Sequence, residues 1–403
     1  MRQVQFEPLQ NVPSFSSRLH TAVQPLMRGN RFDRMEWAGA FGDLGTLIPF
    51  VVAYLSMLSL DPFGVLFTFG LAMVIAGLVY RTPFPVQPMK AAGAVATTQA
   101  AQTLTVTAGA VYAASLVTGV VWLLLGLTGT AQKVTKLIGR PVVVGIILGL
   151  GLGFMLSGAK MMADNWWIGA IGLAGTLLLL TNRRVPAMFL LLVFGAVCGV
   201  ATDAKMLEQL AGVTVELHLP TFALGSVSWN DLLIGTVFLA LPQVPLTLGN
   251  AVIAITEENN QLFPDRPVSE QRVAVSTGIM NLGSAALGGI PMCHGAGGMA
   301  GHVRFGARTG GAPIILGVIL LLLALLFSSS VSTLLRIFPP AVLGVILFLT
   351  GAQLALGACD ISKDKGERFA TVITAALAIW NVGIAFVAGS AVYLLARRGW
   401  LRL

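Results

Sequence analysis

The sequence predicts an all-α polytopic membrane protein with 14 transmembrane segments, arranged as a seven-plus-seven inverted repeat. Of the 403 residues, 56% are hydrophobic and 10% are charged, whereas a soluble domain carries about 25% charged residues. Apolar runs of roughly 17 to 25 residues, long enough to cross a hydrocarbon core, recur from about Trp37 to Arg397. The second half also repeats motifs of the first half. These observations exclude a soluble enzyme.

Proline, glycine and charged residues divide the apolar chain into its segments. The predicted segments are 36–57, 62–80, 87–101, 107–128, 140–158, 165–181, 185–202, 231–255, 269–288, 292–303, 310–329, 340–358, 367–380 and 382–397. The third and tenth are too short to cross as ordinary helices, and we expect a short extended piece before each of these broken segments. The domains are then an N-terminal arm (1–35), a first repeat (36–202), a linker (203–230) and a second repeat (231–403). Alternating apolar residues over 213–219 predict a short strand in the linker.

The distribution of Lys and Arg gives the orientation of the predicted segments. One side of the membrane holds 21 of the 25 basic residues and the other holds 3, which leaves Lys90 alone within a segment. The positive-inside rule places the basic side, with both termini, in the cytoplasm and the linker outside. This asymmetry accounts for the net charge of +8 without a nucleic acid partner. The three cysteines have no disulfide or metal-ligand spacing, so we expect no metal and no cofactor.

The internal repeat is visible in three matches at nearly constant spacing. Residues 141–148 match 340–347 at an offset of 199, Pro88-Met89 matches Pro291-Met292 at 203, and Asp43 lies opposite Gln243 at 200. Because each unit contains an odd number of segments, the second must lie inverted in the membrane. Inverted repeats of this kind are a transporter architecture.

The most informative pair of motifs is 82–90 and 288–298, which occupy corresponding positions in the two halves. Each has Pro-rich or Gly-rich backbone before a short run of small residues. Paired broken segments indicate a transporter's binding site, where two half-helix N-termini meet near the midplane. Their free N–H groups and partial positive charge favour an anion. The alternative is that Pro and Gly simply kink two membrane helices.

Lys90 adjoins the first of these motifs, at a depth where a cation costs about 2.5–3.5 kcal/mol. Two helix termini of about +0.5 each and one lysine together carry roughly +2, which balances a dianion such as a tetrahedral oxyanion. The alternative roles of Lys90 are a snorkelling lysine or a structural partner of Asp43.

Asp43 is the one acid well inside a predicted segment, and a buried carboxylate can carry a proton. Its alternative role is to hold a Gly-rich turn together. Gln243, with Thr247 and Asn250, could donate hydrogen bonds to substrate oxygens or could join membrane helices. Glu257 and Glu258 follow at the cytoplasmic end, where gating acids and ordinary solvated acids are both possible.

Cys293 and His294 do not form a catalytic pair, because neighbours on a helix point about 100° apart. We therefore expect no catalytic residues. His294 is instead a hydrogen-bond donor in the pocket, a proton carrier or a structural histidine. The predicted substrate-binding residues are Gln87, Pro88, Met89, Lys90, Gln243, Cys293, His294 and Gly295, and the candidate proton carriers are Asp43 and His294.

The motifs 41–46, 85–91, 291–301 and 304–310 resemble those of the molybdate transporter family, which is distantly related to sulfate permeases. The resemblance covers the chain from about Glu36 onward. It implies a fold shared with sulfate permeases and nucleobase transporters, with a core from segments 1–4 and 8–11 and a gate from 5–7 and 12–14. It also implies import of molybdate, and fold analogy suggests a homodimer. We expect a symporter in the bilayer of a bacterial inner membrane.

Three alternatives stay open on the sequence. The first is a permease for sulfate or another oxyanion, and the second is a nucleobase carrier. A nucleobase site would be expected to need acidic groups where Gln243 and Cys293-His294 stand. The third is a passive anion channel, which concentrative uptake would exclude. Proton coupling is expected because importing a dianion against an inside-negative potential is uphill.

Overall fold

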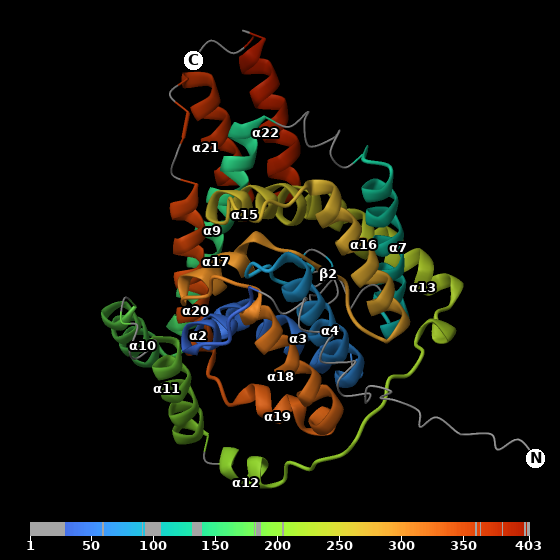
Figure 1. The fold of residues 1–403 in the computed structure, drawn as a ribbon, viewed down its shortest axis with the longest axis vertical. Coiled ribbons are helices and arrows are strands. Elements are labelled where there is room, and N and C mark those ends of the chain that lie inside the picture. Colours follow the sequence, from blue (N-terminus) through green and yellow to red (C-terminus); the bar gives the residue numbers. More distant parts are fainter. Residues whose placement is uncertain are drawn as a thin grey trace, which may run out of the picture.

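The computed structural model describes residues 29–58, 60–90, 92, 106–130, 139–180, 182, 187–203, 205–358, 361–362, 364–380, 382–398 and 400. Most of these residues are helical, and two short strands lie near the centre (Figure 1). The predicted third segment beyond Ala92 and the predicted N-terminal arm up to residue 28 lie outside the described residues. Each of the other predicted segments corresponds to one helix or to a run of consecutive helices, except that the tenth (292–303) begins with a short strand.

In the first half the elements follow the predicted order. They are α2 (Arg34–Ala40), η1 (Phe41–Asp43), α3 (Leu44–Leu58), α4 (Pro62–Tyr80), β1 (Gln87–Pro88), α7 (Ala108–Leu127), α9 (Arg140–Ala163), α10 (Trp166–Leu179) and α11 (Ala187–Thr202). Capping residues set several of the boundaries. The side chain of Asp61 accepts from the N–H of Phe63 at the start of α4, and Arg81 ends that helix in a left-handed conformation with φ 59°.

The second half begins after the linker helix α12 (Met206–Ala211) and the turn η2 (Leu224–Ser226). Its elements are α13 (Trp229–Ile234), η3 (Gly235–Ala240), α14 (Leu241–Leu246), η4 (Thr247–Ala254), α15 (Ile255–Leu262), α16 (Glu270–Ala286), β2 (Met292–Cys293), α17 (Ala296–Arg304), α18 (Gly311–Phe327), η5 (Ser328–Ser330), α19 (Val331–Arg336), α20 (Pro340–Gly357), α21 (Lys365–Trp380) and α22 (Val382–Arg397). Among the described residues, four helices are long and apolar enough to cross a membrane, namely 62–80, 108–127, 140–163 and 311–330.

The eighth segment is longer and less regular than predicted. Its helical run continues from Trp229 to Leu262, past the expected end at residue 255. The π-helical stretches η3 and η4 lie on either side of α14, which contains Pro242 and Pro245. Proline removes a backbone N–H and crowds the preceding turn, and a π-helical turn is one way in which a membrane helix absorbs that disruption.

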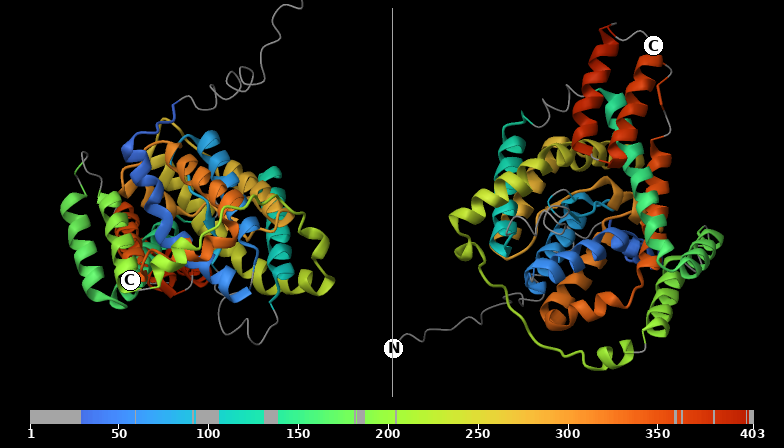
Figure 2. Two further views of the ribbon diagram at one scale, coloured as in Figure 1. Left: turned by 90° about the horizontal axis from the view of Figure 1, so that it is seen from below. Right: turned by 180° about the vertical axis from the view of Figure 1, so that it is seen from behind.

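The helices fall into two groups by contact. In one group α9 packs against α20 and α21, and α22 and α10 pack around them; in the other, α4 packs against α18 and α7 against α16. Figures 1 and 2 show α21 and α22 projecting beyond the rest of the molecule beside α9. The two groups meet where α17 contacts α20 and where η4 contacts α9. Small residues allow close approach within the first group: a Cβ on Gly351 would lie 2.5 Å from the carbonyl oxygen of Gly151.

The described residues of the linker form no strand, so the prediction of one over 213–219 is wrong. The chain there is extended, and it passes around the outside of the molecule from α12 towards α13 (Figure 1). The N–H groups of Glu216 and His218 donate to the carbonyl oxygens of Leu326 and Leu325, at 3.0 and 2.9 Å. The alternating pattern therefore reflects an extended chain that satisfies the last carbonyl groups of α18.

Candidate functional site

The motifs 82–90 and 288–298 meet at the centre of the molecule. Strand β1 pairs antiparallel with β2, with Gln87 opposite Cys293 and Pro88 opposite Met292. The N–H of Met89 extends the pairing by donating to the carbonyl oxygen of Pro291 at 2.9 Å. These residues are buried. Segments about 200 residues apart in sequence thus form one two-stranded unit.

Side chains of α16 hold β2 in place. The amide of Asn281 donates to the carbonyl oxygen of Met292 at 2.6 Å and accepts from its N–H at 2.9 Å. The hydroxyl of Ser284 donates to the carbonyl oxygen of Ile290 at 2.8 Å. Asn281 thereby takes the place of a second neighbouring strand. The backbone groups of β2 need such a partner because no water is available to them inside a membrane protein.

Helical residues follow each strand. Helix α17 starts at Ala296 after the N-cap Gly295, which provides no side-chain hydrogen bond to the N–H groups of its first turn. On the other side, Lys90 is the first helical residue after β1. The N–H of Ala92 donates to Oε1 of Gln243 at 3.3 Å, and Nε2 of Gln243 donates to Thr247 at 3.0 Å. Gln243 therefore binds the backbone just after β1.

The ammonium group of Lys90 is buried and has no hydrogen-bond partner among the described residues. Its Nζ lies 3.8 Å from the centre of the Phe154 ring, which belongs to α9. Asp43 and Cys293 are near enough to interact electrostatically with Lys90, but neither contacts it as an ion pair. A buried cation that lacks an acceptor is available for an anionic ligand.

Asp43 lies on η1, beside the first turn of α17. Its Oδ1 accepts from Nε2 of Gln87 at 2.5 Å, and its Oδ2 lies 2.9 Å from the position that a Cβ on Gly298 would take. The elements η1 and α17 cross closely, because a Cβ on Gly301 would lie 2.5 Å from the carbonyl oxygen of Gly42. Asp43 is thus fully buried against the paired strands and the helix N-terminus.

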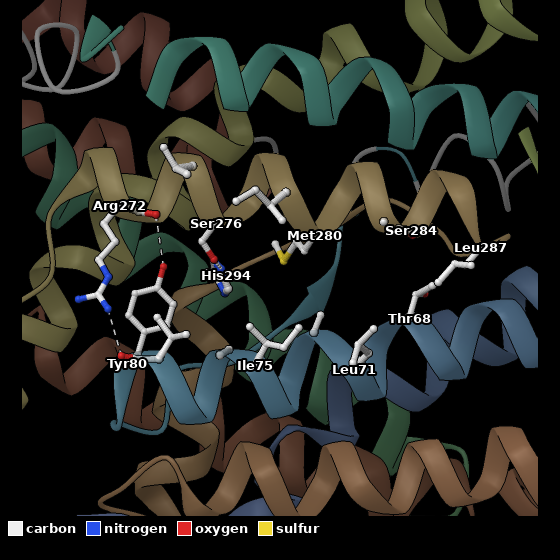
Figure 3. Close-up of a pocket in the computed structure, with 16 residues that line it drawn as sticks. Thr68, Leu71, Ile75, Tyr80, Arg272, Ser276, Met280, Ser284, Leu287 and His294 are labelled. Carbon is white, nitrogen blue, oxygen red and sulfur yellow. Dashed lines mark hydrogen bonds between the residues drawn. The ribbon is translucent and has the colours of Figure 1, made fainter. Parts of the chain in front are cut away.

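His294 is buried, and both of its ring nitrogens are engaged. Nδ1 lies 2.8 Å from the carbonyl oxygen of Pro85, and Nε2 lies 2.6 Å from the hydroxyl of Ser276. Figure 3 shows His294 and Ser276 together on the wall of a largely apolar groove of about 370 Å³ between α4 and α16. Arg272 and Tyr80 lie at one end of this groove. An anion could contact the His294 ring only by replacing one of these two partners.

The structure brings the other predicted residues together. Gln87, Pro88 and Cys293 lie in the strands, Met89 follows β1, and a Cβ on Gly295 would lie 2.0 Å from Oε1 of Gln87. Asn250 adjoins this group, and its Oδ1 has no hydrogen-bond partner among the described residues. Phe154 and Asn281 also line or support this group, and the sequence does not predict either of them. Phe154 lies in an apolar segment, and Asn281 is one of several polar residues in a mostly apolar segment, so neither stands out by pattern.

Glu257 and Glu258, beyond the predicted end of the eighth segment, differ in their surroundings. Glu257 is exposed and accepts from Gln261 at 2.7 Å, as a solvated acid would. Glu258 has its Oε2 buried without a hydrogen-bond partner among the described residues. Burial raises the pKa of Glu258 well above its ordinary value of 4.5. The solvated interpretation therefore holds for Glu257 and is wrong for Glu258.

Comparisons of the sequence with known proteins all point to the same family. The sequence profile described as "Molybdate transporter of MFS superfamily" matches residues 35–154 and 235–354. The chain is 31% identical to molybdate transporter 2 of Arabidopsis thaliana over 94% of both chains. It is 32% identical to molybdate transporter 1 of the same plant, over 90% of this chain and 88% of the relative. Molybdate transporter 1 of Chlamydomonas reinhardtii is 30% identical over 88% of this chain and 89% of the relative.

Solved structures show the same fold at low sequence identity. The murine anion transporter Slc26a9 in its inward-facing state has a TM-score of 0.62 at 11% identity, covering 99% of this chain and 74% of that one. The transmembrane domain of a cyanobacterial bicarbonate transporter, BicA, has a TM-score of 0.51 at 14% identity, covering 91% and 98%. The two segments that match the family profile begin 200 residues apart, which agrees with the offset between Asp43 and Gln243.

Proposed function

The chain belongs to the molybdate transporter family, and we propose that it imports molybdate, bound as a tetrahedral dianion between Lys90 and the N-terminus of α17. Like its family, it is an integral membrane transporter and not an enzyme. The observation that carries the proposed site is the Lys90 ammonium, which is buried without a hydrogen-bond partner among the described residues. An anion at this position satisfies a group that is otherwise costly to bury.

The other groups of the proposed site are neutral donors and backbone. The first turn of α17 offers N–H groups and the positive end of its helix dipole. Gln87 and Cys293, on the paired strands, lie on one side of the proposed anion site. Gln243 and Asn250 lie on the side formed by the eighth segment. His294, held by Pro85 and Ser276, joins the two motifs.

We further propose that import is coupled to protons. Moving a dianion inward against 100 mV costs about 4.6 kcal/mol, at about 2.3 kcal/mol per charge, and two co-transported protons cancel this electrical cost. Asp43 is the better-placed carrier of the two predicted, because it is buried beside α17 and its carboxylate shares a hydrogen bond with Gln87. Nδ1 of His294 donates to the carbonyl oxygen of Pro85, so a proton could be taken up only at Nε2, where the Ser276 hydroxyl would have to change from donor to acceptor.

The cycle that we propose moves one helix group against the other. The core would hold the site on segments 1–4 and 8–11, and the gate would consist of segments 5–7 and 12–14. The contacts of α17 with α20 and of η4 with α9 would then form the surface that changes during transport.

The experiment is uptake of radiolabelled molybdate into proteoliposomes with an inward proton gradient, with and without excess sulfate. Accumulation above equilibrium that resists sulfate is the expected result. Uptake that sulfate abolishes would make the protein a broader oxyanion permease. Equilibration without accumulation would indicate a passive channel, and no uptake at all would refute molybdate as the substrate.

A further inference from the structure

Phe154 contacts both positive elements of the proposed anion site. Its ring, carried by α9, lies with its centre 3.8 Å from Nζ of Lys90. The same ring adjoins the first turn of α17, since a Cβ on Gly297 would lie 2.2 Å from Cε2 of Phe154. The ring therefore occupies space between Lys90 and the helix N-terminus. Lys90 and α17 belong to segments 3 and 10 of the proposed core, whereas α9 belongs to segment 5 of the proposed gate.

The face of an aromatic ring carries negative charge density and attracts an ammonium group. Phe154 thereby supplies the Lys90 ammonium with an interaction that no hydrogen-bond acceptor among the described residues provides. An anionic oxygen bound to the ammonium would lie about 2.7–2.9 Å from Nζ. An anion that bridges Lys90 and α17 must lie between them, so it competes with the ring for the same position.

We propose that Phe154 is a residue of the substrate site that the opposite helix group contributes. Its ring occupies the anion position beside Lys90 and is displaced when the oxyanion binds. This inference rests on the proposed function. It explains how anion binding at Lys90 affects the helix group that contains α9. When the ring leaves Lys90, the contact between α9 and α17 changes as well. Phe154 then sets the affinity for the anion, because part of the binding free energy is used to displace it.

The test is the dissociation constant for molybdate, measured by titration calorimetry on the purified full chain. Phe154→Leu keeps an apolar side chain but removes the ring, and we expect it to lower Kd about 3- to 30-fold because the competing cation–π contact is lost. Phe154→Met serves as a second variant if the first folds poorly. Leu156→Ala, on the same helix at a 49% exposed side chain, is the matched control and should leave Kd unchanged.

A double-mutant cycle separates competition for Lys90 from a general change in packing. In the Lys90→Met background, Phe154→Leu should no longer tighten binding. An unchanged Kd in both Phe154 variants, or tightening that persists without Lys90, would overturn this inference while leaving molybdate binding intact. If the wild-type chain binds no molybdate, the proposed function fails, and this inference fails with it.

Discussion

The side chain of Asn281 binds both the N–H and the carbonyl oxygen of Met292, at 2.9 and 2.6 Å. One residue of α16 thus satisfies the outer edge of β2, while β1 satisfies the inner edge. The short strand stays extended at the centre of the molecule because both of its edges are paired. The geometry of the helix start at Gly295 depends on this arrangement.

Replacing Asn281 with Ala should therefore destabilise the protein and weaken molybdate binding together. Each buried backbone group of Met292 that loses its partner costs about 1–3 kcal/mol, so the melting temperature should fall by several degrees. Thr277→Val, one turn away, is the control, because the hydroxyl of Thr277 has no hydrogen-bond partner among the described residues. Equal melting temperatures for the two variants, measured by thermal unfolding in detergent, would contradict the role of Asn281.

Replacing Lys90 with Met should weaken molybdate binding without unfolding the protein. A hydrogen bond to a charged group contributes about 1.5–3 kcal/mol, which corresponds to an increase in Kd of about 10- to 150-fold. Lys160→Met removes the same charge from an exposed position on α9 and should leave Kd unchanged. If both variants bind like the wild type, Lys90 does not contact the anion.

Replacing Asp43 with Asn tests proton coupling with little change in shape. The new amide oxygen can still accept from Gln87, which Asp43 binds at 2.5 Å, but the side chain no longer titrates. We expect proton-driven accumulation of molybdate to be lost and downhill exchange to remain. Accumulation at the wild-type level, with the wild-type dependence on pH, would exclude Asp43 as the proton carrier.

Two glycine substitutions should have opposite effects on stability. A Cβ on Gly301 would lie 2.5 Å from the carbonyl oxygen of Gly42, so Gly301→Ala forces η1 and α17 apart. Overpacking of this kind typically costs 1–3 kcal/mol, roughly several degrees in melting temperature. Gly175→Ala, in α10, meets no atom within 4 Å and should be neutral or stabilising by about 0.5–1 kcal/mol. Thermal unfolding of the two variants measures both changes, and equal melting temperatures would contradict this prediction.

Glu258 should make stability depend on pH. Burial raises its pKa in the folded protein above 4.5, so folding favours the neutral carboxyl group. The stability from this preference is fully present below pH 4.5 and is lost as the pH rises through the folded-state pKa. Glu258→Gln should remove this decline in melting temperature, whereas Glu257→Gln, at an exposed position, should retain it. Identical pH profiles for all three proteins would show that Glu258 is hydrated when folded.

The sequence indicated where the candidate site lies, but not all of the residues that surround it. Pro88 and Pro291 interrupt apolar runs at matching positions, and Lys90 is a lone cation in a predicted segment, so both signals were visible without coordinates. Phe154 is one apolar residue among many in its segment, and its approach to Lys90 depends on how α9 crosses the other helix group. Relative placement of helices is a tertiary property that periodicity does not encode.

Glu36 shows the same limit at a segment boundary. In sequence it begins the first segment and resembles an ordinary interfacial acid. In the structure it is fully buried, and its carboxylate accepts from the N–H groups of Arg308, Thr309 and Ala312 at 2.9–3.2 Å. It caps α18 from the opposite half of the chain, 276 residues away from Ala312. A cap supplied from so far away leaves no local pattern.

The pairing of β1 with β2 also fixes the order in which the molecule can be completed. Met292 leaves the ribosome about 200 residues after Pro88, which at about 5–20 residues per second is roughly 10–40 s of synthesis. During that interval the first strand lacks its native neighbour, in an environment where an unpaired backbone group costs several kcal/mol. The site can thus be completed only after much of the second half has been synthesised, and a chain divided within the linker would have to reassociate before either piece could hold an anion.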